Sequence, residues 1–245
     1  MDKIFYLNKP IVRKEEPDYS KIDAELIDEK FVLVETKNKI LAEPIYHKMK
    51  YENAIDKIYV RESVLEHLEM ASNYLPDDIF LKVLDGYREY SFQEYLFKRY
   101  KEDIIKEFNL EEKDEEEKNK VISQYVSYPE KDSSLAPAHI TGGAVDVILS
   151  DKDGKELDMG VEFDAFSDKA STDYYENNFI DEVVKKNRRI LFNAMTLAGF
   201  TSLPTEIWHY DLGDKNWAFY REKQVVYGGV FKKDELELLE DKKDE

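Results

Sequence analysis

The sequence predicts an α+β fold, because helices and short strands are mixed without a regular βαβ alternation. Between Val64 and Ala71, apolar residues recur at the 3, 4, 7 spacing of one helical face. Short apolar runs at 79–84 and 144–149 are followed by turn residues and predict strands. With 245 residues, the chain can bury a core for one domain with appendages.

In the first half of the chain, short apolar runs predict strands and one periodic segment predicts a helix. The expected strands are residues 31–34, a short extended piece at 40–45, and a central strand at 79–84. The helix that includes Val64 is expected to stop at Pro76. Asp-Gly-Tyr-Arg at 85–88 has the composition of a turn.

The middle of the chain is polar and predicts a second helix with loops around it. Ser91 and Glu94 have the spacing of a capping box, which predicts a helix that starts there and runs toward Ile105. The charge run 111–120 is expected to be a solvated helix face or a mobile connector, without chemistry. Residues 124–137 contain prolines and serines and predict a loop.

The second half of the chain contains further strands and one long helix. The expected elements are a strand at 144–149 with a hairpin turn at 151–154, a helix at 181–198 ended by Gly199, a strand beginning at Ile207, and a final hairpin of 217–220 with 225–227. The acidic tail from Lys232 is expected to fray.

The composition excludes several classes of function. A formal net charge of −18 disfavours nucleic acid and an anionic membrane surface as partners. The chain has no cysteine, so neither a disulfide nor a thiolate ligand is available. No apolar run of about 18 residues is present, and the N-terminal residues do not resemble a signal peptide, so we expect a cytoplasmic protein without a membrane span.

Two short motifs contain the most specific chemistry of the chain. His139 and Asp146 lie in one motif, and Glu206 and His209 lie in the other; only four histidines occur in all. Two imidazoles and one carboxylate as ligands, with one spare carboxylate to move a proton, form the set of groups used by catalytic zinc sites.

The spacing within the first motif favours a metal site. Asp146 lies in the middle of an apolar strand, where its charge needs compensation by a metal, by an arginine or by backbone hydrogen bonds. His139 precedes it by seven positions, which on a straight strand would place the two side chains on opposite faces. Gly142 and Gly143 permit a bend that directs both toward one point.

The second motif allows a similar interpretation. Glu206 and His209 are three positions apart, but Pro204 indicates that Glu206 lies at a loop–strand junction, where strand parity does not apply. The alternative is an exposed glutamate and a packed histidine. The other two histidines, His47 and His67, are interpreted as surface residues.

These residues resemble the zinc D-alanyl-D-alanine dipeptidases of the VanX type, in peptidase family M15. The resemblance rests on the segment from Pro137 to Asp146, the Glu206-Ile-Trp-His209 motif, and three accessory segments. Those segments are Asp-Gly-Tyr-Arg at 85–88, Met-Gly-Val-Glu-Phe-Asp at 159–164, and Asn-Arg-Arg at 187–189. The resemblance covers roughly residues 44–220.

The resemblance implies a fold, a cofactor and a set of roles. The fold would be Hedgehog/DD-peptidase-like, with a central, mostly antiparallel sheet and flanking helices. One Zn²⁺ per chain would be bound by His139, Asp146 and His209. Glu206 would be the general base and acid, Arg88 would stabilise the oxyanion, and Asp164 would bind the ammonium of a small dipeptide.

The chain also departs from the family pattern. Pro137 stands where the family has a serine on the side of the substrate carboxylate, and Ser133 or Ser134 could substitute for it. The alternatives are therefore a related D,D- or L,D-carboxypeptidase that acts on peptidoglycan stems, and a non-catalytic metal-binding module. The expected organisation is an N-terminal extension (1–43), a dipeptidase domain (44–230) with an acidic insertion (101–125), and an acidic tail (231–245).

Overall fold

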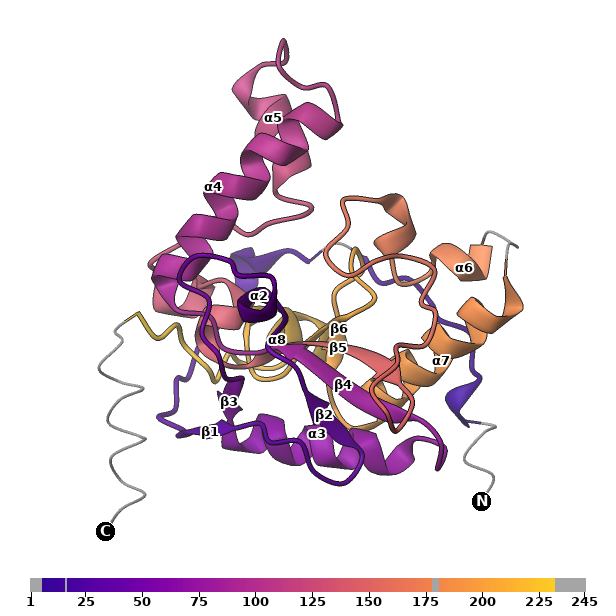
Figure 1. Cartoon of the computed structure of the whole chain (residues 1–245). Helices are drawn as coiled ribbons and strands as arrows, with labels where there is room; N and C mark the ends of the chain where they lie inside the picture. Colours follow the sequence, from indigo (N-terminus) through magenta and orange to yellow (C-terminus); the bar gives the residue numbers. More distant parts are fainter. Residues whose placement is uncertain (1–5, 16, 178–180, 232–245) are drawn as a thin grey trace.

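A five-stranded sheet forms the centre of the computed structural model, which describes residues 6–15, 17–177 and 181–231. The strand order is β2-β4-β5-β7-β6; β2 and β4 are parallel and the other pairs antiparallel. The strands are β2 (Ile40–Ala42), β4 (Phe80–Asp85), β5 (Ala144–Ser150), β7 (His209–Asp211) and β6 (Thr201–Ser202). Together with the flanking helices in Figure 1, this confirms an α+β fold with a mostly antiparallel sheet.

Two long helices pack against each other and against the sheet. They are α3 (Glu62–Tyr74) and α7 (Glu182–Leu197), and α3 runs along one side of the sheet in Figure 1. Leu68 of α3 and Leu191 of α7 are fully buried in the same core as the sheet residues. Asp181 caps α7 by accepting bonds from two backbone amides, and Gly199 ends it at a φ of +107°. The helix expected around Val64 to Ala71 and the helix expected at 181–198 are both confirmed.

Strand β5 lies in the middle of the sheet and aligns residues of its neighbours. All seven of its residues are buried. Asp146 pairs with His209 of β7 on one side and with Asp85 of β4 on the other, where the register shifts after Val83. The sheet therefore brings polar residues from three strands to one place.

Helices α4 (Tyr90–Glu107) and α5 (Glu115–Ile122) project from the sheet as a hairpin, as Figure 1 shows. They have their own apolar cluster, which includes Leu96 and Ile104. The expected capping box is wrong: α4 begins at Tyr90, Ser91 lies inside it, and no side chain caps it. The expected solvated helix in the charge run is confirmed as α5, which is capped by Asp114.

The expected C-terminal hairpin is wrong. Residues 217–220 lie in helix α8 (Lys215–Arg221), because the Asp214 carboxylate accepts from the Trp217 backbone amide and starts a helix. Val225 instead bridges Ala24 near the N-terminus. Strand β7 begins at His209 rather than at Ile207. The tail from Lys232 lies outside the described residues.

The remaining elements are short. A two-stranded antiparallel sheet pairs β1 (Phe31–Leu33) with β3 (Tyr59–Arg61). The short helices are η1 (Tyr19–Lys21), α2 (Ile45–Lys48), η2 (Ser133–Leu135), η3 (Ala138–Thr141), η4 (Asp168–Ala170) and α6 (Tyr174–Asn177). In the described ranges, no helix is both long enough and apolar enough to cross a membrane.

Candidate active site

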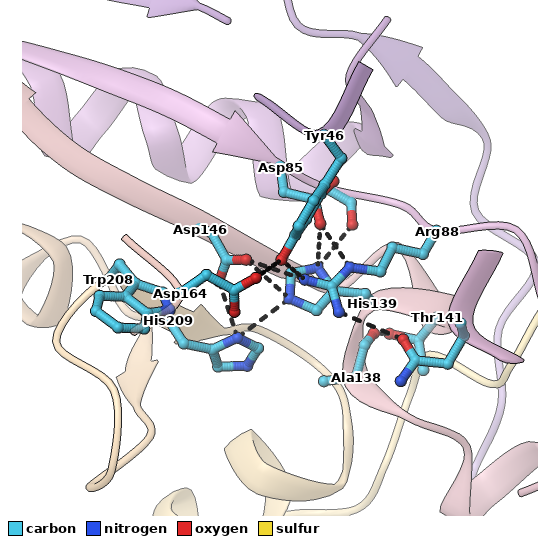
Figure 2. Close-up of polar contacts among 12 residues, drawn as sticks. Tyr46, Asp85, Arg88, Ala138, His139, Thr141, Asp146, Asp164, Trp208 and His209 are labelled. Atoms are coloured by element: carbon cyan, nitrogen blue, oxygen red, sulfur yellow. Dashed lines mark hydrogen bonds and ion pairs between the residues drawn. The ribbon is translucent and has the colours of Figure 1, made fainter. Parts of the chain in front are cut away.

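His139, Asp146 and His209 converge at the centre of the sheet, as Figure 2 shows. His139 comes from η3, Asp146 from β5 and His209 from β7. The inner nitrogen of His139, Nε2, lies 3.2 Å from Nδ1 of His209 and 3.4 Å from Oδ2 of Asp146. Nδ1 of His209 lies 3.1 Å from Oδ1 of Asp146. All three side chains are buried.

The expected glycine bend between His139 and Asp146 is confirmed, although it joins a helix to a strand. Gly142 follows η3 with a φ of +73°, in the left-handed region that favours glycine. A side chain on Gly143 would meet the backbone carbonyl of Leu212. Both glycines are therefore needed where the chain turns from His139 into β5.

The outer nitrogens of both imidazoles are bound to acceptors. Nδ1 of His139 donates to the backbone carbonyl of Gly86 at 2.7 Å, and Nε2 of His209 donates to Oδ1 of Asp211 at 2.8 Å. These bonds orient the rings so that the other nitrogens, Nε2 of His139 and Nδ1 of His209, point inward. Burial opposes a charge on His209, but Asp211 and Asp146 outweigh it and raise the pKa of His209 well above its usual value.

The donor set fits a tetrahedral metal ion. Ligand atoms about 2.0–2.1 Å from a zinc ion, at tetrahedral angles, are separated by roughly 3.3 Å. Here the two inner nitrogens lie 3.2 Å apart, and each lies 3.1–3.4 Å from one of the two oxygens of the Asp146 carboxylate. Two inward lone pairs facing a buried carboxylate also need a shared cation. His139, Asp146 and His209 could therefore hold one metal ion with a fourth position open.

Arg88 lies directly beside this cluster and is already engaged. Its guanidinium contacts Oδ2 of Asp85 at 2.6 Å and Oδ2 of Asp146 at 3.2 Å, and it donates to Gln93 and to the Tyr46 hydroxyl. The sequence left open whether a metal ion or an arginine compensates the charge of buried Asp146. The structure places both an arginine and the two histidines beside it. Arg88 is mostly buried, so its position is well defined.

Asp164 lies next to Arg88 in a loop and has a strained backbone, with a φ of +63°. Its Oδ2 accepts hydrogen bonds from the Tyr46 hydroxyl, at 2.9 Å, and from the Tyr100 hydroxyl. Burial raises the pKa of Asp164, against the opposing effect of the Tyr100 bond. The two tyrosines hold this carboxylate in place.

Glu206 lies in the turn before β7, as expected from Pro204. Its Oε2 accepts a hydrogen bond from Nε1 of Trp208 at 3.1 Å. The Glu206 side chain is half-buried. Burial raises its pKa to about 8, and the negative charges of Asp146 and Asp164 add to the effect. A carboxyl group with such a pKa can exchange a proton near neutral pH.

These groups open into one cavity of about 820 Å³. It is lined by Arg88, His139, Asp146, Asp164, Glu206 and His209, and also by residues 123–128 after α5 and by Tyr19 and Lys215. The cavity size is within the range of about 300–1,000 Å³ for small-molecule sites. Lys120, the last residue of the charge run to which the sequence assigned no chemistry, also lines the cavity.

Pro137 also lines this cavity, whereas Ser133 and Ser134 do not. The hydroxyl of Ser134 donates to Asp132, and that of Ser133 donates to the carbonyl of Gly229. Neither of the two serines that could have substituted for the family serine therefore lines the cavity.

The remaining histidines lie away from the cluster. His47 is exposed, as expected. His67 is half-buried, with Nδ1 2.6 Å from the carbonyl oxygen of Ala198, so the expectation of a simple surface residue is wrong for it.

Sequence reasoning missed Tyr46, Tyr100, Asp85 and Asp211. Tyr46 and Tyr100 reach the site from α2 and α4, far from the motifs in sequence. Asp211 could have been found, because a residue two positions from His209 on a strand shares its face. Asp85 belongs to the Asp-Gly-Tyr-Arg motif and was grouped with Arg88 without a role of its own.

The chain belongs to the peptidase M15 family. The family model described as D-ala-D-ala dipeptidase matches residues 36–227. This range contains all six site residues predicted from the sequence.

Two curated relatives are both D-alanyl-D-alanine dipeptidases. The relative from Synechocystis sp. is 31% identical over 124 residues, which cover 44% of this chain and 50% of the relative. The relative from Escherichia coli is 32% identical over 81 residues, which cover 33% of this chain and 40% of the relative. The matched part of the chain thus spans half or less of the length of these relatives.

Solved structures show weaker similarity. A variant of the vancomycin resistance D,D-pentapeptidase VanY in complex with Zn(II) aligns with a TM-score of 0.42 at 13% identity, covering 90% of this chain and 97% of that chain. The LdcB LD-carboxypeptidase aligns with a TM-score of 0.35 at 19% identity, covering 71% and 70%.

Proposed function

We propose that the protein is a zinc metallopeptidase that hydrolyses D-Ala-D-Ala or a related short dipeptide. The observation that carries this proposal is the convergence of the inner nitrogens of His139 and His209, 3.2 Å apart, on the Asp146 carboxylate, whose two oxygens lie 3.1 and 3.4 Å from them, beside the Glu206 carboxyl group with a raised pKa. Membership of the M15 family and the two dipeptidase relatives support it.

The residues have distinct tasks in this proposal. A zinc ion held by the three ligands would polarise the scissile carbonyl and lower the pKa of water to about 7. Glu206 takes the proton of the attacking water and passes it to the departing amine. The glutamate can return to its starting state after each cycle, because it both accepts and donates the proton.

Arg88 and Asp164 act on the substrate. The Arg88 guanidinium, fixed by Asp85, stabilises the negative charge that develops on the carbonyl oxygen. The Asp164 carboxylate, held by two tyrosine hydroxyls, binds the free ammonium of the peptide. An ammonium site this close to the ligand cluster favours very short peptides.

The test is the substitution Glu206→Gln in protein analysed for zinc. The amide has a similar shape and does not act as a general base, so kcat for D-Ala-D-Ala should fall about 100- to 10,000-fold with zinc retained. Glu66→Gln, on the exposed face of α3, is the matched control and should keep full activity. A Glu206→Gln enzyme with normal kcat would contradict the proposal.

A related carboxypeptidase that trims longer peptidoglycan stems is the second candidate. The cavity of about 820 Å³ favours it, because this size lies near the upper end for small-molecule sites, and Pro137 replaces a serine in the wall. The two functions are separated by kcat/KM for D-Ala-D-Ala, L-Ala-D-Ala and a pentapeptide. Zinc binding without turnover of any of them would indicate a non-catalytic metal-binding module.

We also propose that the substrate cavity is completed by the N-terminal extension and by the acidic insertion within the domain at 44–230. The N-terminal extension (1–43) contributes Tyr19, and the acidic insertion (101–125) contributes Ser123 and Tyr125. Deletion of residues 101–125 should therefore change substrate preference.

A further inference from the structure

We propose that Lys215 determines specificity by binding the free carboxylate of the peptide substrate. This inference rests on the proposed peptidase function. It assigns a residue to the end of the substrate opposite the ammonium bound by Asp164.

Lys215 lies in the same cavity as the ligand cluster. It is the first residue of α8, and its Nζ donates to the backbone carbonyl of Leu135 at 2.7 Å. Leu135 is two residues before Pro137 and four before His139. The ammonium group is therefore anchored to the segment that leads into the first metal ligand, on the wall that contains Pro137.

The charge of Lys215 is not neutralised by a close carboxylate. Within the described ranges, no acidic oxygen lies within the 4.0 Å ion-pair distance of its Nζ, whereas Arg88 has two acidic partners. Its other close contact is the ring of Tyr19, whose centroid is 5.1 Å from Nζ. Burial lowers the pKa of Lys215, which agrees with a cation that lacks a direct anionic partner. Such a cation in a cavity is suited to bind an anion.

The cavity has two electrostatically distinct regions. Asp164 and Glu206 both interact with Arg88 and Asp146, in the region of the ligand cluster. Lys215 interacts over longer distances with Asp214, Asp211 and Glu130, of which Asp211 also accepts the hydrogen bond from His209. A zwitterionic peptide would place its ammonium at Asp164 and its carboxylate at Lys215, with a peptide bond between them at the ligand cluster.

The N-terminal segment supports the position of Lys215. The Tyr19 hydroxyl donates to Oδ1 of Asn216, which is buried beside Lys215, and the Tyr19 ring contacts the ammonium. Pro17, Tyr19 and Ser20 line the cavity, and they precede residue 36, where the family match begins. This part of the binding wall is therefore built by a segment outside the family match.

The experiment compares D-Ala-D-Ala with its C-terminal amide. Wild-type enzyme should prefer the free acid. Lys215→Met should lower kcat/KM for the acid about 10- to 100-fold, chiefly through KM, with little effect on the amide, because a charge-assisted contact is lost. Lys215→Arg keeps the charge and should recover most of the preference. Lys152→Met, at an exposed turn, is the charge-matched control.

A binding measurement separates this inference from the proposed function. In zinc-loaded Glu206→Gln protein, the Kd of D-Ala-D-Ala measured by calorimetry should weaken about 10- to 100-fold on Lys215→Met. An unchanged Kd together with an unchanged preference for the acid would overturn the role of Lys215. Wild-type protein that binds the dipeptide through Lys215 but hydrolyses no peptide would contradict the peptidase function alone.

Discussion

Replacement of Arg188 by methionine should destabilise the protein strongly and weaken substrate binding. Arg188 lies on α7 and is 1% exposed. Its guanidinium donates to the backbone carbonyls of Met159, Ser171 and Lys169 at 2.7, 2.8 and 2.5 Å. These carbonyls flank both sides of the loop that contains Asp164. One side chain thus holds the two ends of a functional loop.

The magnitude follows from these three bonds. Methionine fills similar space but leaves three carbonyls without their donor, and loss of one partner from a buried charged network costs about 3–5 kcal/mol. For a chain of this size, each kcal/mol corresponds to about 2–4 °C in Tm, so Tm should fall by about 6–20 °C. KM for the dipeptide should rise because Asp164 loses its support, while zinc content should remain unchanged.

The assay is thermal and urea unfolding of Arg188→Met and of Arg99→Met. Arg99 lies on the exposed face of α4, so its replacement should change the unfolding free energy by less than about 1 kcal/mol. If Arg188→Met lowers the free energy of unfolding by no more than Arg99→Met does, the three hydrogen bonds to the carbonyls do not support the loop, and the reasoning is refuted.

Three further predictions concern the ligand cluster. Removal of zinc by a chelator should lower Tm by roughly 8–16 °C, since a ligand at 1,000 times its Kd contributes about 4 kcal/mol; an unchanged Tm would indicate an unfilled site. Gly142→Ala should lower the free energy of unfolding by about 2–4 kcal/mol and weaken zinc binding. The reason is that Gly142 has a φ of +73°, and its added methyl group would overlap the Phe31 ring. Calorimetry checks both effects. In metal-free protein, Glu206 holds its proton up to a pKa of about 8, against an ordinary value of 4.5. The folded state then binds more protons than the unfolded state between these values, so stability should fall as pH rises through this window, and Glu206→Gln should flatten the slope measured by urea unfolding.

The ligand cluster could be predicted from the sequence because its chemistry is encoded in short segments. His139 and Asp146 are separated by a glycine pair, and only a few arrangements of such a segment direct both side chains to one point. Glu206 and His209 lie on one turn and the start of the strand that follows it. The pairing of Asp146 with His209 across β5 and β7 then required only that the two strands be neighbours.

The environment of the cluster depended on contacts between distant segments. Tyr46 and Tyr100 bond Asp164 from more than 60 residues away, and no local spacing indicates this. Likewise, Tyr19 reaches Asn216 across most of the chain. Such contacts are decided by tertiary packing, which a periodic pattern in one segment does not describe.

Two local errors have a physical cause. The aromatic run at 217–220 has strand propensity, but the buried Asp214 supplies a helix cap that outweighs it. Ser91 and Glu94 match a capping box, yet helix α4 begins one residue earlier, so the serine lies inside the helix. At 217–220 the preceding Asp214, rather than the preference of the segment itself, determined the structure, whereas α4 starts without any side-chain cap.

The most direct test of the account is hydrolysis of D-Ala-D-Ala by protein of known zinc content. We predict one zinc ion per chain, hydrolysis that stops when a chelator removes the zinc, and recovery when zinc is returned. His209→Ala should abolish both zinc binding and turnover. Turnover that persists without metal, or zinc-loaded protein that cleaves neither D-Ala-D-Ala nor any longer D-Ala-terminated peptide, would contradict the central claim.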